Sequence, residues 1–141
     1  MPLKIIENHL ISSEEEAAIR EALRSFNLSK ISNHGPYGEL SLVLRDESDV
    51  ISGGLTARYA YRWMFIALLV VPERARGQGL GTELMQRAER VAREKELTGI
   101  WTDTFAFQAP EFYKKLGYRQ FGEIGDEPGR SRLFFVKRLQ A

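Results

Sequence analysis

The sequence predicts an α/β (α+β) protein in which helices pack against one sheet. Two observations carry this prediction. Segments with the two-residue alternation of strands are interspersed with segments of helical periodicity, and the longest apolar run, residues 63–71, lies between them in the middle of the chain. The chain has 141 residues, of which 43% are apolar and 28% are charged. This length and composition are typical of a single domain over residues 1–141.

The N-terminal part is expected to form a short strand at residues 3–7, then a helix and a polar loop. Ser12 and Ser13 precede Glu15 and Glu16 by three residues, and either pair has the spacing of a capping box at the start of a helix. Apolar side chains follow at helical spacing, and the helix should end near Asn27. The loop that follows, residues 27–38, contains a Gly-Pro pair that breaks regular structure.

Three consecutive strands should come next. Residues 39–45 alternate, with leucines on one face, and a short polar turn then leads into a second strand at residues 50–61. The adjacent glycines Gly53 and Gly54 inside this strand indicate a bulge or a close approach of another backbone. The run 63–71 is apolar on both faces, which is typical of a central strand that is covered on both sides.

The second half of the chain is expected to add two helices and three strands. They are an amphipathic helix at 80–95, a strand at 100–105, a short helix at 110–117, and closing strands at 118–123 and 132–137. Because a single helix connects the apolar run to the strand 100–105, these two strands should be parallel neighbours.

Charge and cysteine content exclude several classes of protein. Twenty basic and 19 acidic residues give a formal net charge of +1, which lacks the basic excess of a nucleic-acid or membrane-surface binder. The absence of cysteine excludes a disulfide framework, a thiol nucleophile and a Cys-ligated metal site. The longest apolar run is about half of the roughly 20 residues that span a membrane, and the N-terminus lacks the apolar stretch of a signal peptide. We therefore expect a cytoplasmic protein.

The turn between the apolar run and the next helix carries the strongest sign of a binding site. Gly77, Gly79 and Gly81 alternate there, so a ligand can approach the main-chain N–H groups without meeting a Cβ atom. These N–H groups lie at a helix N-terminus, which favours anions, and Arg74 and Arg76 add positive charge. A phosphate or pyrophosphate is the ligand implied. The spacing fits neither a P-loop nor a dinucleotide-binding fingerprint.

This turn resembles the acetyl-CoA site of the GNAT N-acetyltransferases. The family signature R/Q-x-x-G-x-G/A is met by Arg76, Gly79 and Gly81, and the preceding strand end of the type L-x-V is met by Leu69 and Val71. The resemblance implies that acetyl-CoA is the co-substrate and that no metal is needed.

A second segment, residues 107–118, is similar to the late part of the same family, where an aromatic helix carries a tyrosine and ends in K-x-G-F/Y. Together the two resemblances cover essentially the whole chain. They imply a single N-acetyltransferase domain with a GNAT-like acyl-CoA N-acyltransferase fold. In that fold, a central, mixed and mostly antiparallel sheet of six to seven strands is flanked by three to four helices.

The resemblance also implies roles for individual residues. Backbone N–H groups from Arg76 to Thr82 would hold the pyrophosphate, the main chain at the end of the apolar run would pair with the pantetheine arm like an added strand, and Tyr113 would act as general acid at the thioester sulfur. The residues assigned to the cofactor are Leu69, Val70, Val71, Arg76, Gly77, Gln78, Gly79, Leu80, Gly81, Thr82, Gln108, Phe112 and Lys115.

The reaction implied is direct attack of an amine on the thioester, with an unidentified small-molecule amine as acceptor. Many family members carry an acidic residue on the central strand, and residues 63–71 have none. Asp103, His34, Glu39 or a water chain are the alternatives for the general base, although Asp103 shares strand parity with aromatic residues expected in the core. The missing acid also leaves open a catalytically inactive CoA-binding regulatory or interaction module. O-acyl transfer, longer acyl groups and a homodimer stay open too.

Overall fold

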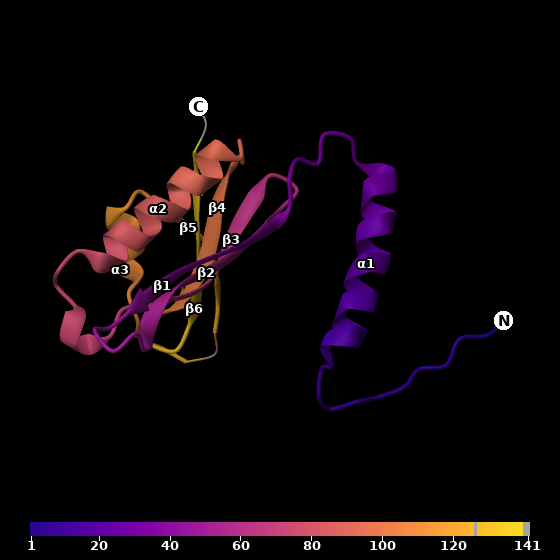
Figure 1. The fold of residues 1–141 in the computed structure, drawn as a ribbon, viewed down its shortest axis with the longest axis horizontal. Coiled ribbons are helices and arrows are strands. Elements are labelled where there is room, and N and C mark those ends of the chain that lie inside the picture. Colours follow the sequence, from indigo (N-terminus) through magenta and orange to yellow (C-terminus); the bar gives the residue numbers. More distant parts are fainter. Residues whose placement is uncertain (126, 140–141) are drawn as a thin grey trace. The chain divides into compact units, whose positions relative to one another are not determined.

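The computed structural model describes residues 1–125 and 127–139, and the chain falls into two compact units, Met1–His34 and Gly35–Ala141 (Figure 1). The first unit contains one helix, and the second contains every strand of the described residues. Within the described residues, no helix combines the length and the apolar composition that a membrane span requires. The single domain expected from the sequence stays a prediction.

The helix α1 (Ser13–Lys30) begins at the predicted capping box. The Glu15 N–H donates to Ser12 Oγ at 3.0 Å, and Ser12 Oγ donates to Glu15 Oε1 at 2.9 Å. Such a cap typically stabilises a helix by about 1 kcal/mol. The helix continues beyond the predicted end, because the Ile31 N–H still donates to the carbonyl of Asn27 at 3.0 Å.

The strand predicted at residues 3–7 is wrong, because this segment has no regular secondary structure. An extended segment becomes a strand only when its N–H and C=O groups pair with a neighbouring strand. In the part of the chain that the structure describes, the first strand is β1 (Gly38–Arg45), and residues 3–7 contribute no strand.

The second unit is built on a six-stranded mixed sheet with the order β1-β2-β3-β4-β6-β5. The strands after β1 are β2 (Ile51–Ala60), β3 (Trp63–Val70), β4 (Gly99–Phe105), β5 (Arg119–Ile124) and β6 (Arg132–Arg138). The neighbours β3 and β4 are parallel, and all other neighbouring pairs are antiparallel. The sequence prediction of a parallel pair joined by one crossover is therefore confirmed.

Two helices cover one face of this sheet: α2 (Leu80–Glu94) and α3 (Pro110–Lys115), drawn on the same side in Figure 1. The apolar stripe of α2 packs against the middle strands. Its buried members are Leu84, Met85, Ala88 and Ala92, and their partners in the core include Met64, Ile66, Ile100 and Phe135. A fully buried side chain of this size stabilises the fold by about 1.5–3 kcal/mol, so this layer holds the helices that frame the site.

The strand β4 faces the core with Ile100 and two threonines, and the sequence did not indicate the threonines. Thr102 and Thr104 are buried, and Thr102 Oγ1 donates to the carbonyl of Ile66 at 2.9 Å, so its burial leaves no hydroxyl unsatisfied. The expectation that Trp101 and Phe105 belong to the core is wrong, because strand alternation places them on the opposite face and Phe105 is 37% exposed.

A bulge in β3 opens the sheet. Ala57 pairs with Ile66 but the next residue back, Thr56, pairs with Leu68, so Ala67 is an extra residue in the strand. The pairing of β3 with β4 runs only from Trp63 to Ile66. Beyond the bulge the two strands separate, and this separation positions the site described below.

The paired glycines of β2 are close approaches, as predicted. A Cβ atom on Gly54, whose φ is +140°, would overlap the carbonyl of Leu42, and one on Gly53 would lie 2.5 Å from the carbonyl of Val70. Only glycine lets β2 lie so close to both neighbouring strands at this point.

A buried polar cluster ties α2 to the end of α3 and to β6. Tyr118 donates its hydroxyl hydrogen to Glu89 Oε2 at 2.9 Å, and Lys137 Nζ donates to Glu89 Oε1 at 3.0 Å. The same Nζ donates to the carbonyl of Leu116 at 2.8 Å. Because Leu116 caps α3, Lys137 fixes the helix that carries Tyr113.

Replacing Lys137 with methionine should lower the free energy of unfolding by about 2 kcal/mol, because the buried Glu89 would lose the nearer of two cationic partners and keep only Arg93 at 3.7 Å. Urea unfolding followed by circular dichroism measures this. Lys114→Met is the matched control: the Lys114–Glu111 pair has 48% and 74% exposed side chains, so its loss should cost less than about 0.5 kcal/mol. Equal losses in the two variants would contradict the structural role given to Lys137.

Candidate active site

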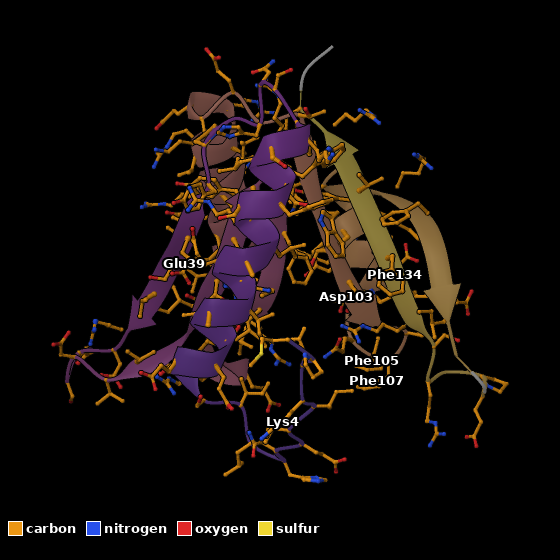
Figure 2. The ribbon with its side chains drawn as sticks, turned by 90° about the vertical axis from the view of Figure 1, so that its right-hand side faces the viewer. Lys4, Glu39, Asp103, Phe105, Phe107 and Phe134 are labelled. Carbon is orange, nitrogen blue, oxygen red and sulfur yellow. The ribbon has the colours of Figure 1, made fainter. Side chains whose placement is uncertain are left out.

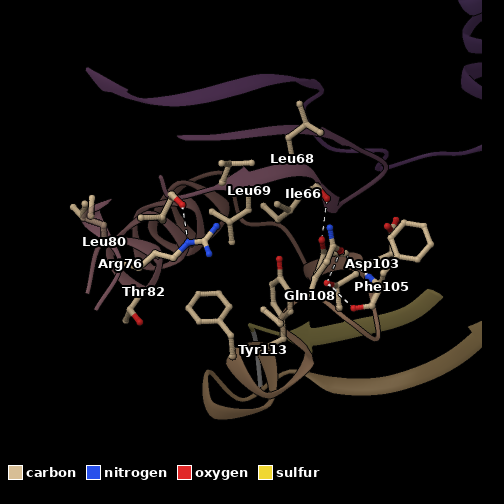
Figure 3. A pocket seen from close by; sticks show the side chains of 18 of the residues that line it. Ile66, Leu68, Leu69, Arg76, Leu80, Thr82, Asp103, Phe105, Gln108 and Tyr113 are labelled. Atoms are coloured by element: carbon tan, nitrogen blue, oxygen red, sulfur yellow. Dashed lines mark hydrogen bonds between the residues drawn. The ribbon is translucent and has the colours of Figure 1, made fainter. Parts of the chain in front are cut away.

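A cavity of about 890 Å³ opens in the second unit where β3 and β4 separate (Figure 3). Its walls come from the end of β3, the glycine turn, the start of α2, the end of β4 and the helix α3. Figure 3 shows Arg76, Leu80 and Thr82 at one end, Asp103, Phe105 and Gln108 at the other, and Tyr113 between them. The volume is within the range of roughly 300–1,000 Å³ that small-molecule sites occupy.

The glycine turn forms a cradle of main-chain donors at the start of α2. Gly77 and Gly79 have left-handed φ angles of +82° and +80°, which only glycine adopts without strain. The Glu83 N–H donates to the carbonyl of Gly79 and closes the first turn of the helix. Within the described residues, the N–H groups from Gly77 to Thr82 have no main-chain acceptor, so they are open to an anion.

Arg76 contributes its side chain rather than its backbone. Its N–H donates to the carbonyl of Glu73 at 3.2 Å, so the donor cradle begins one residue later than expected from the sequence. Its Nε donates to the carbonyl of Val71 at 3.1 Å, which holds the guanidinium across the turn. Among the described lining residues, Arg76 is the only basic one, and it marks this end of the cavity as positive.

The third glycine allows a close contact with the opposite wall. A Cβ atom on Gly81 would lie 3.3 Å from the ring of Phe112, so a larger residue would displace the aromatic wall of the cavity. Phe112 in turn meets the ring of Tyr113 edge-on, with 5.2 Å between centroids. The start of α2 and the helix α3 are therefore packed directly against each other at the cavity.

The end of β3 presents an unpaired edge to the cavity. Leu69 and Val70 pair with β2 on one side, and β4 no longer pairs with them on the other. Main-chain groups on such an edge can accept an extended ligand in the manner of an added strand. The carbonyl of Val71, which was expected to take part, is already engaged by Arg76.

Gln108 fixes the turn between β4 and α3. Its Oε1 accepts hydrogen bonds from the Phe105 N–H at 2.8 Å and from Thr104 Oγ1 at 3.0 Å, and its side chain also lines the cavity. The turn is thereby held in one shape next to the place where α3 begins. Pro110 occupies the first turn of that helix, where a missing N–H has no cost.

Tyr113 lies in the centre of the cavity wall with its phenol oxygen directed toward β3 (Figure 3). Its ring is 5% exposed and stacks on Phe135 at 5.7 Å between centroids. Burial raises the pKa of the Tyr113 phenol, the negative charge of Asp103 raises it further, and the Thr102 side chain acts in the opposite direction. The phenol is therefore a hydrogen-bond donor that keeps its proton at neutral pH.

The structure brings most of the predicted cofactor residues together. All of them line the cavity except Gln78 and Lys115, and the catalytic candidate Tyr113 lines it too. Lys115 is exposed on α3. Sequence reasoning missed several lining residues, namely Ile66, Ala67, Leu68, Ala75, Thr102, Thr104 and Ala109. The first three lie at the bulge of β3, which no glycine or proline in that strand indicates.

Of the candidate bases named from the sequence, Asp103 alone belongs to the cavity lining of the described residues. Glu39 lies on β1, which β2 and β3 separate from β4. His34 belongs to the first unit. The side chain of Asp103 is 17% exposed, and its Oδ1 pairs with Arg132 Nε at 3.1 Å. This ion pair links β4 to β6 and fixes the position of the carboxylate at the cavity.

The sequence and the fold of this chain are similar to those of known acetyltransferases. The sequence profile of the acetyltransferase (GNAT) family matches residues 4–118. An acetyltransferase of Agrobacterium fabrum is 30% identical over 138 residues, which are 97% of this chain and 100% of that protein. The blasticidin-S acetyltransferase of Streptomyces morookaense is 36% identical over 120 residues, 84% of this chain and 88% of that protein. The crystal structure of an acetyltransferase from Bacillus cereus ATCC 14579 is 39% identical, with a TM-score of 0.78 and coverage of 96% and 97%.

Proposed function

The chain belongs to the acetyltransferase (GNAT) family and is an acetyltransferase of that type, and from this premise we propose that it transfers the acetyl group of acetyl-CoA to the amine of a small molecule. The observation that carries the proposal is the run of unengaged N–H groups from Gly77 to Thr82, which borders a cavity beside the unpaired end of β3. The pyrophosphate of acetyl-CoA fits the N–H groups of the glycine turn. Its extended pantetheine arm, which carries amide groups, fits the unpaired edge of β3.

The proposed chemistry needs a neutral amine and a stabilised leaving group. An ammonium loses two protons in the reaction. The first leaves before the nitrogen bonds to the acetyl carbon, and the second leaves the nitrogen as the C–S bond of the thioester breaks and passes through water to the thiolate. Removing the first proton from an ammonium with a pKa of ~10.4 costs about 4.6 kcal/mol of free energy at pH 7. Asp103 is the group that can take this proton, directly or through water, and Tyr113 can donate a hydrogen bond to the sulfur as charge develops.

Thermal unfolding with acetyl-CoA, desulfo-CoA and ATP tests the proposal. At a hundred times the dissociation constant, a bound ligand stabilises the fold by ~2.7 kcal/mol, which corresponds to a shift of several degrees. We expect both CoA compounds to raise the melting temperature and ATP to leave it unchanged. No shift with either CoA compound would contradict a CoA site at the glycine turn.

A catalytically inactive CoA-binding module is the second candidate, and the observation that favours it is the lack of an acidic residue on β3. Release of free thiol from acetyl-CoA in the presence of small amines separates the two candidates. Thiol release that depends on the amine supports the enzyme, whereas binding without turnover across a broad amine panel supports the module. The homodimer and the cytoplasmic location expected from the sequence stay predictions.

A further inference from the structure

The cavity is electrostatically polarised along its length. Arg76 is the only basic residue and Asp103 the only acidic residue in its lining, as far as the structure describes the chain. They lie at opposite ends in Figure 3. A negative group is therefore attracted to the glycine turn. At the other end, Arg132 outside the lining pairs with Asp103, so a ligand ammonium there must compete with or join this ion pair.

Asp103 enters the cavity from the face of β4 that is turned away from the core. Its neighbours on the strand, Thr102 and Thr104, are buried on the helix-covered face, so Asp103 reaches the opening between β3 and β4 from the other side. Arg132 Nε lies 3.1 Å from Asp103 Oδ1. The carboxylate is 17% exposed and lines the cavity, so a ligand ammonium can reach it there.

Two phenyl rings stand beside this carboxylate. Phe105 and Phe107 stack with 5.3 Å between centroids and 16° between planes, and both line the cavity. They are 37% and 68% exposed, so neither is a core residue. Figure 2 shows Asp103, Phe105 and Phe107 grouped at the end of β4. Because Gln108 clamps the Phe105 N–H, the turn that presents these rings is held rigid before any ligand arrives.

We propose that Asp103, Phe105 and Phe107 form the acceptor subsite, and that the acceptor is a cationic amine with a planar ring close to the amine. The carboxylate binds the ammonium, and the 68% exposed ring of Phe107 stacks on the planar group. Phe105 supports Phe107 from behind, because Phe107 and the guanidinium of Arg132 both lie over its ring. An acceptor with its own carboxylate next to the amine is disfavoured, because Asp103 repels it. This inference rests on the proposed acetyl transfer and adds the chemical class of its acceptor.

Acetylation of three probe amines tests the subsite in the full chain. Phenethylamine and cyclohexylethylamine have the same number of carbon atoms but differ in ring planarity, and phenylalanine adds a carboxylate beside the amine. We expect kcat/KM for phenethylamine to exceed that for cyclohexylethylamine at least threefold, and that for phenylalanine at least tenfold. Equal values for phenethylamine and cyclohexylethylamine, or for phenethylamine and phenylalanine, would overturn the proposal.

Two variants assign the effect to named residues. Phe107→Leu should bring the kcat/KM values of the two ring-bearing amines to within twofold of each other, and Phe107 is exposed enough that folding is not at issue. Asp103→Asn should raise KM for phenethylamine at least tenfold while acetyl-CoA binding stays unchanged. Phe121→Leu and Asp49→Asn are the matched controls, since both residues are exposed and outside the cavity lining.

The outcomes separate this inference from the proposed function. If acetyl-CoA raises the melting temperature and amines are acetylated, but Phe107→Leu and Asp103→Asn behave like their controls, the acceptor subsite is overturned and the acetyltransferase stands. If acetyl-CoA produces no shift and no amine is acetylated, both are overturned.

Discussion

Replacing Gly79 with alanine should weaken acetyl-CoA binding at least tenfold and lower the free energy of unfolding by only about 1–2 kcal/mol. The φ of Gly79 is +80°, and an added Cβ would meet nothing within 4 Å in the free protein, so the loss of stability comes from backbone conformation alone. The larger effect appears on binding, because the methyl group would stand at the main-chain donors that an anion must approach. Isothermal titration with acetyl-CoA and desulfo-CoA measures it.

The chain offers a closely matched control at Gly129. Its φ is +81° and a Cβ there would also meet nothing within 4 Å, but it lies in the turn between β5 and β6, outside the cavity lining. Gly129→Ala should therefore cost a similar amount of stability and leave the dissociation constant unchanged. A similar loss of affinity in both variants would mean that the effect at Gly79 is conformational, and that the turn is not a ligand cradle.

Replacing Tyr113 with phenylalanine should lower kcat tenfold or more, with little change in the affinity for acetyl-CoA. Transferring a proton from a phenol of pKa ~10 to a thiolate of pKa ~8.5 is uphill by roughly 2 kcal/mol. Burial raises the pKa of the Tyr113 phenol, which makes complete transfer still less favourable. Tyr113 therefore acts by donating a hydrogen bond to the developing charge, and the variant removes that donor while it keeps the packed ring.

Steady-state kinetics from pH 7 to about pH 9.5 check this role. The raised pKa keeps the phenol protonated above its ordinary range. The ratio of kcat for the unchanged protein to kcat for Tyr113→Phe should therefore stay constant across this pH interval. Tyr118→Phe is the control: it removes the hydrogen bond to the buried Glu89 and should lower stability without a comparable loss of kcat. A rate ratio near one at every pH would remove Tyr113 from the mechanism.

The features that could be predicted from the sequence are those with local causes. The capping box at Ser12 depends on residues three apart, and the left-handed turn at Gly77 and Gly79 follows from the conformational freedom of glycine. The parallel pairing of β3 and β4 follows from chain connectivity, because one helix lies between them. These features place the glycine end of the cavity correctly.

The acceptor end could not be predicted, because it depends on contacts between strands. Alternation along β4 puts Trp101 and Phe105 on one face and Thr102 and Thr104 on the other. Hydropathy predicts the aromatic face as the core, whereas the threonine face is the one that is buried. Thr102 is buried because the carbonyl of Ile66 accepts its hydroxyl hydrogen, and Trp101 lies outside although it is larger and more apolar. The side on which Asp103 emerges is settled by that packing, which no pattern within residues 99–105 encodes.

The extra residue in β3 has a consequence for the gene as well as for the fold. Met64 and Ile66 face the core before the bulge, and Leu69 faces it after the bulge, so the strand changes parity at Ala67. Loss of the single codon for Ala67 would restore the regular alternation of side chains along β3. The strands β3 and β4 could then pair along their whole length and close the site. Lineages that keep the activity should therefore tolerate many substitutions at this point and purge insertions and deletions of one residue.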